Sequence, residues 1–373
     1  MKQKGAEKIH GVLMILFTLI VIAAISFAYV AAAPPDLITV TIHSGDSFTA
    51  KLDEAAGGDR SSIASLKIVT NGYSLSSADF GSLKSMATNG AGRLTYLDLQ
   101  EAACAYNQIP DGAFDNTGNN IILQKILLPN SITDIGNFAF YNCSGLTGGL
   151  NLPNGITSIG GGAFYNCSGL TGSLNLPNSL IGIGNIAFSR CSGLTGSLIL
   201  PANLEQINPG AFFGCSGFSS LTIPNGVLSI GSDAFNGCSG FTGSLTIPDS
   251  VTSIDYNAFR DCSGFTGSLT IPAGITGIAE MVFANCSGFT GNLVIPNGVT
   301  SIGNGAFEGC SGFKGKLNIP DSVTSIGYYA FYGCSGFTGS LTTPGSVTGI
   351  DFYAFYGCSG FTGSLIISDG VTS

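Results

Sequence analysis

The chain is poor in the residues that carry much of enzyme chemistry and most nucleic-acid contacts. Its 373 residues include no tryptophan and only two histidines, and charged residues make up 9% of the total. The histidines are His10 and His43, so the later part of the chain has none, which excludes a Ser-His-Asp or Cys-His arrangement there. The formal net charge is −9, so the sequence lacks the basic footprint typical of nucleic-acid binding. We therefore expect no nucleic acid partner.

Low charge does not make the chain disordered, because hydrophobic residues account for 44% of it. Disordered segments combine high charge with too few apolar residues to form a core. A single globular core rarely grows beyond about 250–300 residues. A solenoid escapes that limit because its core lengthens with each coil. Composition and length are therefore compatible with a repeat protein.

What the chain has in abundance is one 24-residue motif, which fills it from about Lys125 to the last residue in ten copies. One copy runs from Ser244 to Gly267. A cysteine marks each copy, and every step is 24 residues except that from Cys215 to Cys238, which is 23. A fixed period of this length is typical of a solenoid, in which neighbouring coils bury each other's apolar face. The ten cysteines are Cys143, Cys167, Cys191, Cys215, Cys238, Cys262, Cys286, Cys310, Cys334 and Cys358.

The order of residues within one copy predicts how a coil is built. Leu245 and Ile247 alternate with polar residues, which indicates a short strand with the aliphatic side chains inward. A Pro-Asp-Ser turn follows, and Val251 and Ile254 then form a second short extended segment. The Ala-Phe-x-x-Cys segment should form a tight bend or a 3₁₀ turn. The fold class is thus a mainly β repeat solenoid with one long parallel sheet, and no segment has the length or the 3.6-residue period of a true helix.

The regular pattern Leu-x-Ile-Pro-x-Gly/Ser-Val-Thr-Ser-Ile-Gly-x-x-Ala-Phe-x-x-Cys resembles the BspA-like, or Treponema-type, leucine-rich repeat. The resemblance covers roughly residues 60–373. The usual repeat of that family is one residue shorter, and here an extra glycine such as Gly243 or Gly267 precedes the strand, which predicts a small bulge. The resemblance implies a curved leucine-rich-repeat solenoid, and bacterial or protist surface proteins that bind host or neighbouring-cell macromolecules.

The cysteines of the array occupy one equivalent place per coil, beside Ala and Phe. Stacked coils place equivalent residues about 4.8 Å apart with parallel side-chain directions. A disulfide needs converging directions and Cβ atoms about 3.8 Å apart. We therefore favour a ladder of buried free thiols over disulfides. Metal binding is disfavoured as well, because thiolate sites need ligands clustered from different directions.

The N-terminal segment has the features of an export signal. Three lysines precede the apolar stretch 12–30, and small residues follow it before Pro34. This order predicts a signal peptide over residues 1–32, with an uncleaved N-terminal anchor as the alternative. The protein is accordingly expected to be secreted or on the cell surface, with membrane contact only through this segment if it stays uncleaved.

The rest of the chain divides into three parts. Residues 33–60 are interpreted as a polar N-terminal cap, which an end coil needs to cover its apolar face. Residues 61–120 contain degenerate leucine-rich repeats, and 121–373 contain the ten regular ones. The chain stops in the middle of a coil at Ser373, so we expect that the C-terminus is truncated and hides a further anchor or domain.

The acidic and hydroxyl side chains of the repeats give no enzymatic constellation. Ser and Thr recur with the repeat period, which indicates structure and no unique nucleophile. Asp255 and Asp261 are close in sequence, but a glycosidase pair needs two carboxyl groups about 5–9.5 Å apart in a cleft, and a solvated turn is the simpler interpretation. We expect no catalytic residues, no metal and no cofactor, so the protein is not an enzyme.

Recognition in a repeat protein depends on the positions that vary between copies. Aromatic residues gather at these positions in the last two complete coils, with Tyr256 alone three coils earlier. They predict an exposed aromatic strip that binds sugars or peptide segments, since tyrosine gives contact area at low entropic cost. A ladder that only stabilises the stacking of coils is an equal alternative. The strip consists of Tyr328, Tyr329, Tyr332, Phe352, Tyr353 and Tyr356.

The outward positions of the first strand form a second, weaker candidate surface. They are small and nearly uncharged, which suits hydrogen bonding to an extended polymer or peptide. Rows of Ser and Thr also resemble ice-binding faces, although Asn, Ile, Val and Lys interrupt these rows. The candidate residues are Ser244, Thr246, Ser268, Thr270, Asn292, Asn318 and Thr342.

Together these observations predict an exported, non-catalytic adhesion or ligand-binding scaffold for extracellular proteins or glycans. The alternative is a structural spacer or surface-layer stalk, whose functional domain lies in a missing C-terminal part.

Overall fold

The computed structural model describes residues 33–118 and 121–372. Residues Ile38–Ser373 form one compact unit, distinct from Met1–Leu37, and the description below concerns this unit. The expected signal peptide or anchor, residues 1–32, lies outside the described residues. Among the described residues, no helix is both long and apolar enough to cross a membrane.

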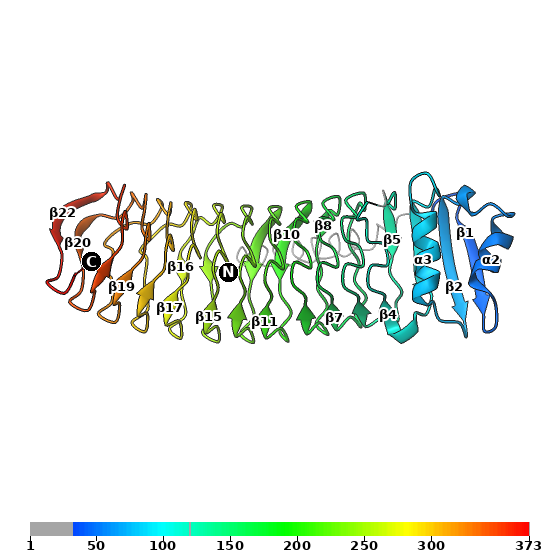
Figure 1. The fold of residues 1–373 in the computed structure, drawn as a ribbon, viewed down its shortest axis with the longest axis horizontal. Coiled ribbons are helices and arrows are strands. Elements are labelled where there is room, and N and C mark those ends of the chain that lie inside the picture. The colour runs from blue at the N-terminus through cyan, green and yellow to red at the C-terminus, as the bar shows by residue number, and fades with distance from the viewer. Residues whose placement is uncertain (1–32, 119–120, 373) are drawn as a thin grey trace, which may run out of the picture. The chain divides into compact units, whose positions relative to one another are not determined.

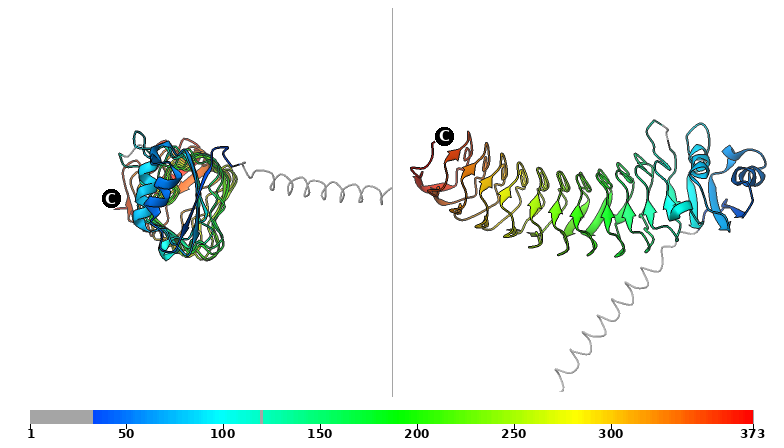
Figure 2. Two further views of the ribbon diagram at one scale, coloured as in Figure 1. Left: turned by 90° about the vertical axis from the view of Figure 1, so that its right-hand side faces the viewer. Right: turned by 60° about the horizontal axis from the view of Figure 1, so that its bottom comes forward.

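The unit is a solenoid whose coils follow one another along a single axis in chain order (Figure 1). Every pair of neighbouring strands is parallel, as in Leu245 beside Leu269 and Ile302 beside Ile326. The row of coils bows gently in the second view of Figure 2. The predicted fold class, a mainly β leucine-rich-repeat solenoid, is confirmed.

The first coils carry two α-helices, so the expectation that no true helix occurs was wrong. Helix α2 (Phe48–Ala55) begins after Ser47, whose hydroxyl accepts a hydrogen bond from the Ala50 amide. Helix α3 (Ser77–Met86) begins with a reciprocal capping box between Ser76 and Asp79. Short helices gain stability mainly from packing, and both helices bury aromatic and aliphatic side chains in the solenoid core. Two 3₁₀ turns complete this part, η1 (Arg60–Ser62) and η2 (Ala105–Asn107).

The first strand of each coil was expected to join one long parallel sheet. In the structure these strands form several shorter sheets instead. In order along the solenoid, the sheets contain the following strands. They are β1 (Ile38–His43), β2 (Ser65–Asn71), β3 (Tyr96–Glu101) and β5 (Lys125–Leu127); β8 (Gly172–Ser173), β10 (Leu194–Ile199) and β12 (Phe218–Thr222); β14 (Leu245–Thr246) and β16 (Leu269–Thr270); and β20 (Gly339–Thr342) and β22 (Phe361–Ile366).

The extra glycine before the strand explains part of this interruption. Gly196 and Gly339 both have positive φ, and the strand register shifts directly after each of them. The first shift occurs where a 24-residue coil meets the 23-residue coil, so two residues of one strand oppose one of the other. The shift at Gly339 is where the predicted bulge occurs, whereas at Gly196 the unpaired residue is Ser219, in the coil that lacks the additional glycine.

The second extended segment of each coil forms a more regular ladder of two-residue strands. It holds the Ser-Ile step of the repeat, with the isoleucine pointing into the core. The strands are β4 (Gln108–Ile109), β6 (Asp134–Ile135), β7 (Ser158–Ile159), β9 (Gly182–Ile183), β11 (Gln206–Ile207), β13 (Ser229–Ile230), β15 (Ser253–Ile254), β17 (Gly277–Ile278), β18 (Ser301–Ile302), β19 (Ser325–Ile326) and β21 (Gly349–Ile350).

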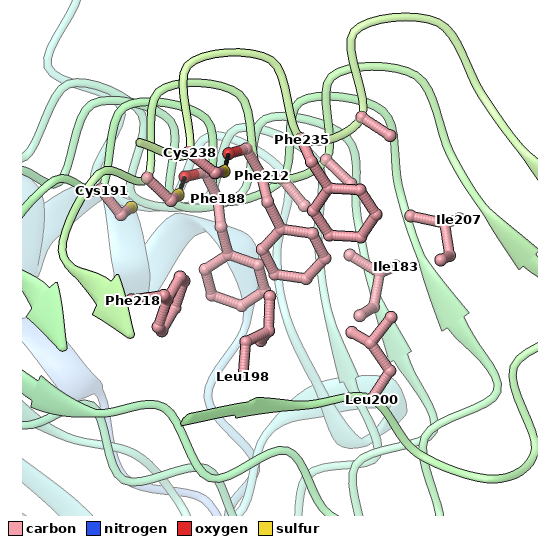
Figure 3. Packing of buried hydrophobic residues seen from close by; sticks show 14 of the residues in the cluster. Ile183, Phe188, Cys191, Leu198, Leu200, Ile207, Phe212, Phe218, Phe235 and Cys238 are labelled. Carbon is pink, nitrogen blue, oxygen red and sulfur yellow. Dashed lines mark hydrogen bonds between the residues drawn. The ribbon is translucent and has the colours of Figure 1, made fainter. Parts of the chain in front are cut away.

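Two ladders of phenylalanine rings fill the core between these strands (Figure 3). The first contains the phenylalanine of each Ala-Phe step, and its rings stack 5.2–5.7 Å apart from Phe114 to Phe355. The second contains the phenylalanine of the Ser-Gly-Phe step, and it meets the first edge-on, as Phe241 meets Phe235 at 6.1 Å. Offset stacks and edge-to-face contacts are the favourable geometries for aromatic pairs.

The cysteines form the buried free-thiol ladder that the repeat predicted. Each Sγ donates a hydrogen bond to the phenylalanine carbonyl of the preceding coil, as Cys262 does to Phe235 at 3.1 Å. The same carbonyl also accepts from the Cys238 amide, so it accepts from two donors. Burial raises the pKa of the Cys191 thiol to about 12, which keeps it protonated and unreactive.

The glycine of the Ser-Gly-Phe step is required by close approach of the coils. A Cβ atom at Gly264 would lie 2.2 Å from the carbonyl oxygen of Ser239 and 2.6 Å from that of Phe241. A Cβ atom at Gly182, by contrast, would meet no atom within 4 Å, and other coils have serine there.

We expect Gly264→Ala to destabilise the protein by about 1–3 kcal/mol, because two backbone carbonyls of the preceding coil must move. Gly182→Ala serves as the control, and it should leave stability unchanged or raise it by up to about 1 kcal/mol, because it reduces the entropy of the unfolded chain. Urea unfolding followed by circular dichroism measures both changes. A tolerated Gly264→Ala would show that coil spacing is not set at this glycine.

Candidate aromatic binding surface

The aromatic residues predicted from the repeats meet on two neighbouring coils. We call Tyr328, Tyr329, Tyr332, Phe352, Tyr353 and Tyr356 the C-terminal patch. Five of the six side chains are exposed, and Tyr332 is half-buried. The structure therefore places these residues together at the surface, as the sequence predicted.

Four tyrosines of the C-terminal patch form a closed square of ring contacts. Between coils, Tyr329 stacks on Tyr353 and Tyr332 stacks on Tyr356, each pair at 5.4 Å and within 12° of parallel. Within each coil the two rings meet edge-on, at 5.4 Å for Tyr329 with Tyr332 and 5.5 Å for Tyr353 with Tyr356. Tyr328 stacks on Phe352 at 6.1 Å beside this square. The predicted stacking of rings on adjacent coils is thus observed.

This arrangement decides which parts of the rings a ligand can reach. In each stacked pair the two facing ring surfaces cover one another, and ring edges and phenol groups remain for contact. Ring edges carry the positive part of the aromatic quadrupole, and phenols donate and accept hydrogen bonds.

The backbone at two of these tyrosines has a conformation that tyrosine disfavours. Tyr329 and Tyr353 have φ of 57° and 59°, in the left-handed region. This conformation costs a non-glycine residue about 1–2 kcal/mol. The equivalent place holds Gly, Asp or Asn in half of the regular coils, for example Asn257. The two tyrosines therefore occupy a place where the backbone alone favours smaller residues.

A second group of aromatic residues lies near the other end of the array, and the sequence prediction did not include it. We call Phe138, Tyr141, Tyr165 and Arg190 the N-terminal patch. Tyr141 stacks on Tyr165 at 4.6 Å, and Phe138 meets Tyr141 edge-on at 5.5 Å. Alignment of the repeats already places Phe138 at the position of Tyr329, and Tyr141 and Tyr165 at that of Tyr332, so the signal was present for these three residues.

The sheet-face residues of the weaker prediction all point to solvent. The burial of Leu245 and Leu269 between exposed Ser244, Thr246 and Thr270 shows the expected alternation. Asn318 and Thr342 line a shallow hollow of about 300 Å³ together with Lys316 and Asp321. The exposed residues of this row are Ser244, Thr246, Ser268, Thr270, Asn292, Asn318 and Thr342.

The remaining candidates give no sign of chemistry. Tyr256 is exposed, and it has no ring partner among the residues with described positions. Asp261 accepts a hydrogen bond from Asn285 at 2.8 Å and lies beside Arg260, as expected for a surface turn. Across residues 33–118 and 121–372, no group of three His, Cys, Asp or Glu side chains is arranged to hold a metal ion.

Comparison with solved structures shows the same fold in a bacterial protein. A leucine-rich repeat protein from Bacteroides ovatus is 22% identical, with a TM-score of 0.53 over 73% of this chain and 78% of that one. A leucine rich cell surface protein from Faecalibacterium prausnitzii is 25% identical, with a TM-score of 0.43 over 72% of this chain and 84% of that one. A search of curated proteins found no match.

The family comparison covers most of the chain. The model described as "BspA type Leucine rich repeat region (6 copies)" matches residues 107–242, 195–314 and 289–373. These ranges together include all ten regular coils and both aromatic patches. A leucine-rich-repeat solenoid is typically a binding scaffold without catalytic residues. The chain belongs to the BspA-type leucine-rich repeat family.

Proposed function

We propose that the protein is an exported adhesion or ligand-binding protein of the cell surface, which binds an extracellular protein ligand through the C-terminal patch. The family membership supports a repeat scaffold for protein interaction. The similar protein from Faecalibacterium prausnitzii is described as a cell surface protein, which supports the location. The export signal predicted over residues 1–32 supports secretion.

One observation carries the binding site. Four tyrosines form a closed square of contacts on two coils, and two of them occupy left-handed backbone positions that hold Gly, Asp or Asn in half of the regular coils. Backbone strain kept at a surface cluster is a reason to assign function to that cluster. Tyrosine is also among the residues that dominate the energy of protein interfaces.

The double variant Tyr329→Asn, Tyr353→Asn tests this site without straining the backbone, because Asn257 already occupies the equivalent place. We expect its affinity for the bound ligand to fall at least tenfold, since interface tyrosines often contribute more than about 1.4 kcal/mol. An array of extracellular matrix proteins and glycans, probed with the purified protein, identifies the ligand and measures the change.

Tyr256→Asn is the matched control, because it removes an exposed tyrosine that lies outside the C-terminal patch. It should bind as the unchanged protein does. Equal binding by the double variant would reject the site, and capture of glycans alone would reject a protein ligand. Failure to bind any molecule on the array would favour the spacer function.

A further inference from the structure

The N-terminal patch contains an exposed arginine, Arg190, at a repeat position where every other regular coil has a different residue type. Arg190 directly precedes Cys191 and has φ of 63°. In the nine other regular coils the residue before the cysteine is Asn, Asp or Gly, which are the residues that tolerate the left-handed region. Among the ten regular coils, Arg190 is therefore the single exception, and the backbone conformation at this position does not favour arginine.

The guanidinium of Arg190 is held in position by the neighbouring ring. Its central carbon lies 5.8 Å from the centroid of the Tyr165 ring, within cation–π range. No ion pair joins Arg190 to a carboxylate in the described part of the chain. A planar, positioned guanidinium with no anionic partner is suited to a bidentate contact with a carboxylate.

The rest of the patch is built around this stack. Phe138 is 47% exposed, although its φ of 55° is also left-handed. Its ring lies over Gly162, where a Cβ atom would be 2.8 Å from two ring carbons. Glycine at that position therefore leaves the room that the Phe138 ring occupies. Below the rings, the Asn166 amide donates to the Asn142 side-chain oxygen at 3.2 Å, which links the two coils.

We propose that the N-terminal patch is a second binding site, which accepts a carboxylate side chain of an extended segment of the protein ligand. This proposal rests on the proposed function, because it concerns the same ligand. Arg190 binds the carboxylate, and Phe138 and the tyrosines contact the apolar residues beside it.

Phe138, Tyr141 and Tyr165 occupy the repeat positions of Tyr329 and Tyr332, so the two patches lie on the same side of the array. Arg190 lies one residue further along its coil, at the position of Gly333. Seven coil steps separate Tyr165 from Tyr332, which corresponds to about 34 Å at the spacing of parallel strands. An extended chain covers this distance with about ten residues. A segment of fifteen residues can therefore reach both patches, and joined contacts of this kind strengthen binding through a high effective concentration.

Two immobilised libraries of fifteen-residue peptides test the proposal with the full-length protein. One library randomises Gly, Ser, Leu, Tyr and Glu, and the other contains Gln in place of Glu. We expect at least fivefold greater capture on the Glu library, and the preference should shrink as NaCl screens the charge. Equal capture on both libraries, or capture on neither, would overturn the proposal.

Arg190→Asn is the informative variant, because asparagine suits this backbone and occurs in the same place at Asn166. It should abolish the preference for Glu while the thermal midpoint stays equal or rises. Arg190→Lys should retain part of the preference, since it keeps the charge and loses the planar group. A preference that survives in Arg190→Asn would overturn the assignment.

The C-terminal variant separates this proposal from the proposed function. Tyr329→Asn, Tyr353→Asn should weaken capture on both libraries and leave the Glu-to-Gln ratio unchanged. If that variant binds normally while Arg190→Asn loses the preference, the C-terminal site is wrong and the N-terminal site stands. If it changes the ratio itself, the two patches are not independent contacts and the proposal fails.

Discussion

Raising the pH from 8 to 10.5 is expected to unfold the repeat array, because nine of its ten ladder thiols are buried and Cys358 is half-buried. Burial raises the pKa of Cys143 and Cys191 to about 12 from an ordinary value of 9.0, and it raises the pKa of the other ladder thiols as well. The cause is desolvation, which disfavours the thiolate in the folded chain.

The direction of the effect follows from proton binding. Above pH 9 the unfolded chain releases protons that the folded chain keeps, so the stability present below pH 9 is lost as the pH rises toward 12. At pH 10 each such thiol reduces the free energy of unfolding by about 1.4 kcal/mol. Ten thiols together reach on the order of 14 kcal/mol, which is comparable to the whole stability of a typical domain.

Circular dichroism and thiolate absorbance near 240 nm, recorded in one titration, measure this prediction. Both signals should change together, with a midpoint between about pH 9 and 11. Thiolate absorbance that appears while the dichroism of the fold persists would contradict it. Cys310→Ala provides an internal control at a pH where the array is still folded: its destabilisation relative to the unchanged protein should be smaller at pH 9 than at pH 7 by about 0.4 kcal/mol.

The fold class was predictable because each coil repeats one pattern, and errors at single positions cancel over ten copies. The inward direction of Leu245, the exposure of Thr246 and the burial of Cys262 all followed from period-2 alternation and the fixed place of cysteine. The stacking of Tyr329 on Tyr353 followed in the same way, since equivalent residues of parallel coils lie next to one another.

The irregular features were harder to predict because they depend on local backbone geometry. The capping residues Ser76 and Asp79 were a usable signal for helix α3, but the degenerate repeat pattern around Phe80 suggested a leucine-rich-repeat unit without a helix. The long sheet is divided where the register shifts beside glycines of positive φ such as Gly196; the extra glycine predicted a bulge, but it did not predict that the sheet would be divided.

The N-terminal patch was missed for a different reason. Its four side chains come from three coils and include no run of aromatic residues comparable to Tyr328-Tyr329. The role of Arg190 becomes visible only when the left-handed backbone and the contact with Tyr165 are known. Rules about residue type at variable positions find tyrosine clusters more readily than they find a single strained arginine.

Removal of one central ring, Phe235→Ala, is expected to cost about 3–5 kcal/mol, the usual loss for a fully buried phenylalanine. Phe235 is 0% exposed and stacks between Phe212 at 5.7 Å and Phe259 at 5.3 Å, so the cavity would have a coil on either side. In a solenoid each coil contacts only its neighbours, and a weak central coil therefore divides the array in two.

The matched control is Phe355→Ala, which removes the equivalent ring near the C-terminal end of the array. Phe355 is half-buried and stacks on Phe331 alone among the described residues, so its loss should be less than about half as large. Urea unfolding measures both, and limited proteolysis should cut the Phe235→Ala protein near that coil. Equal losses would show that the coils do not act as nearest-neighbour units.

Because Phe235 lies between the coils of Tyr165 and Tyr332, its loss should also weaken capture of long peptides more than that of short ones, as joint binding needs both patches on one continuous array.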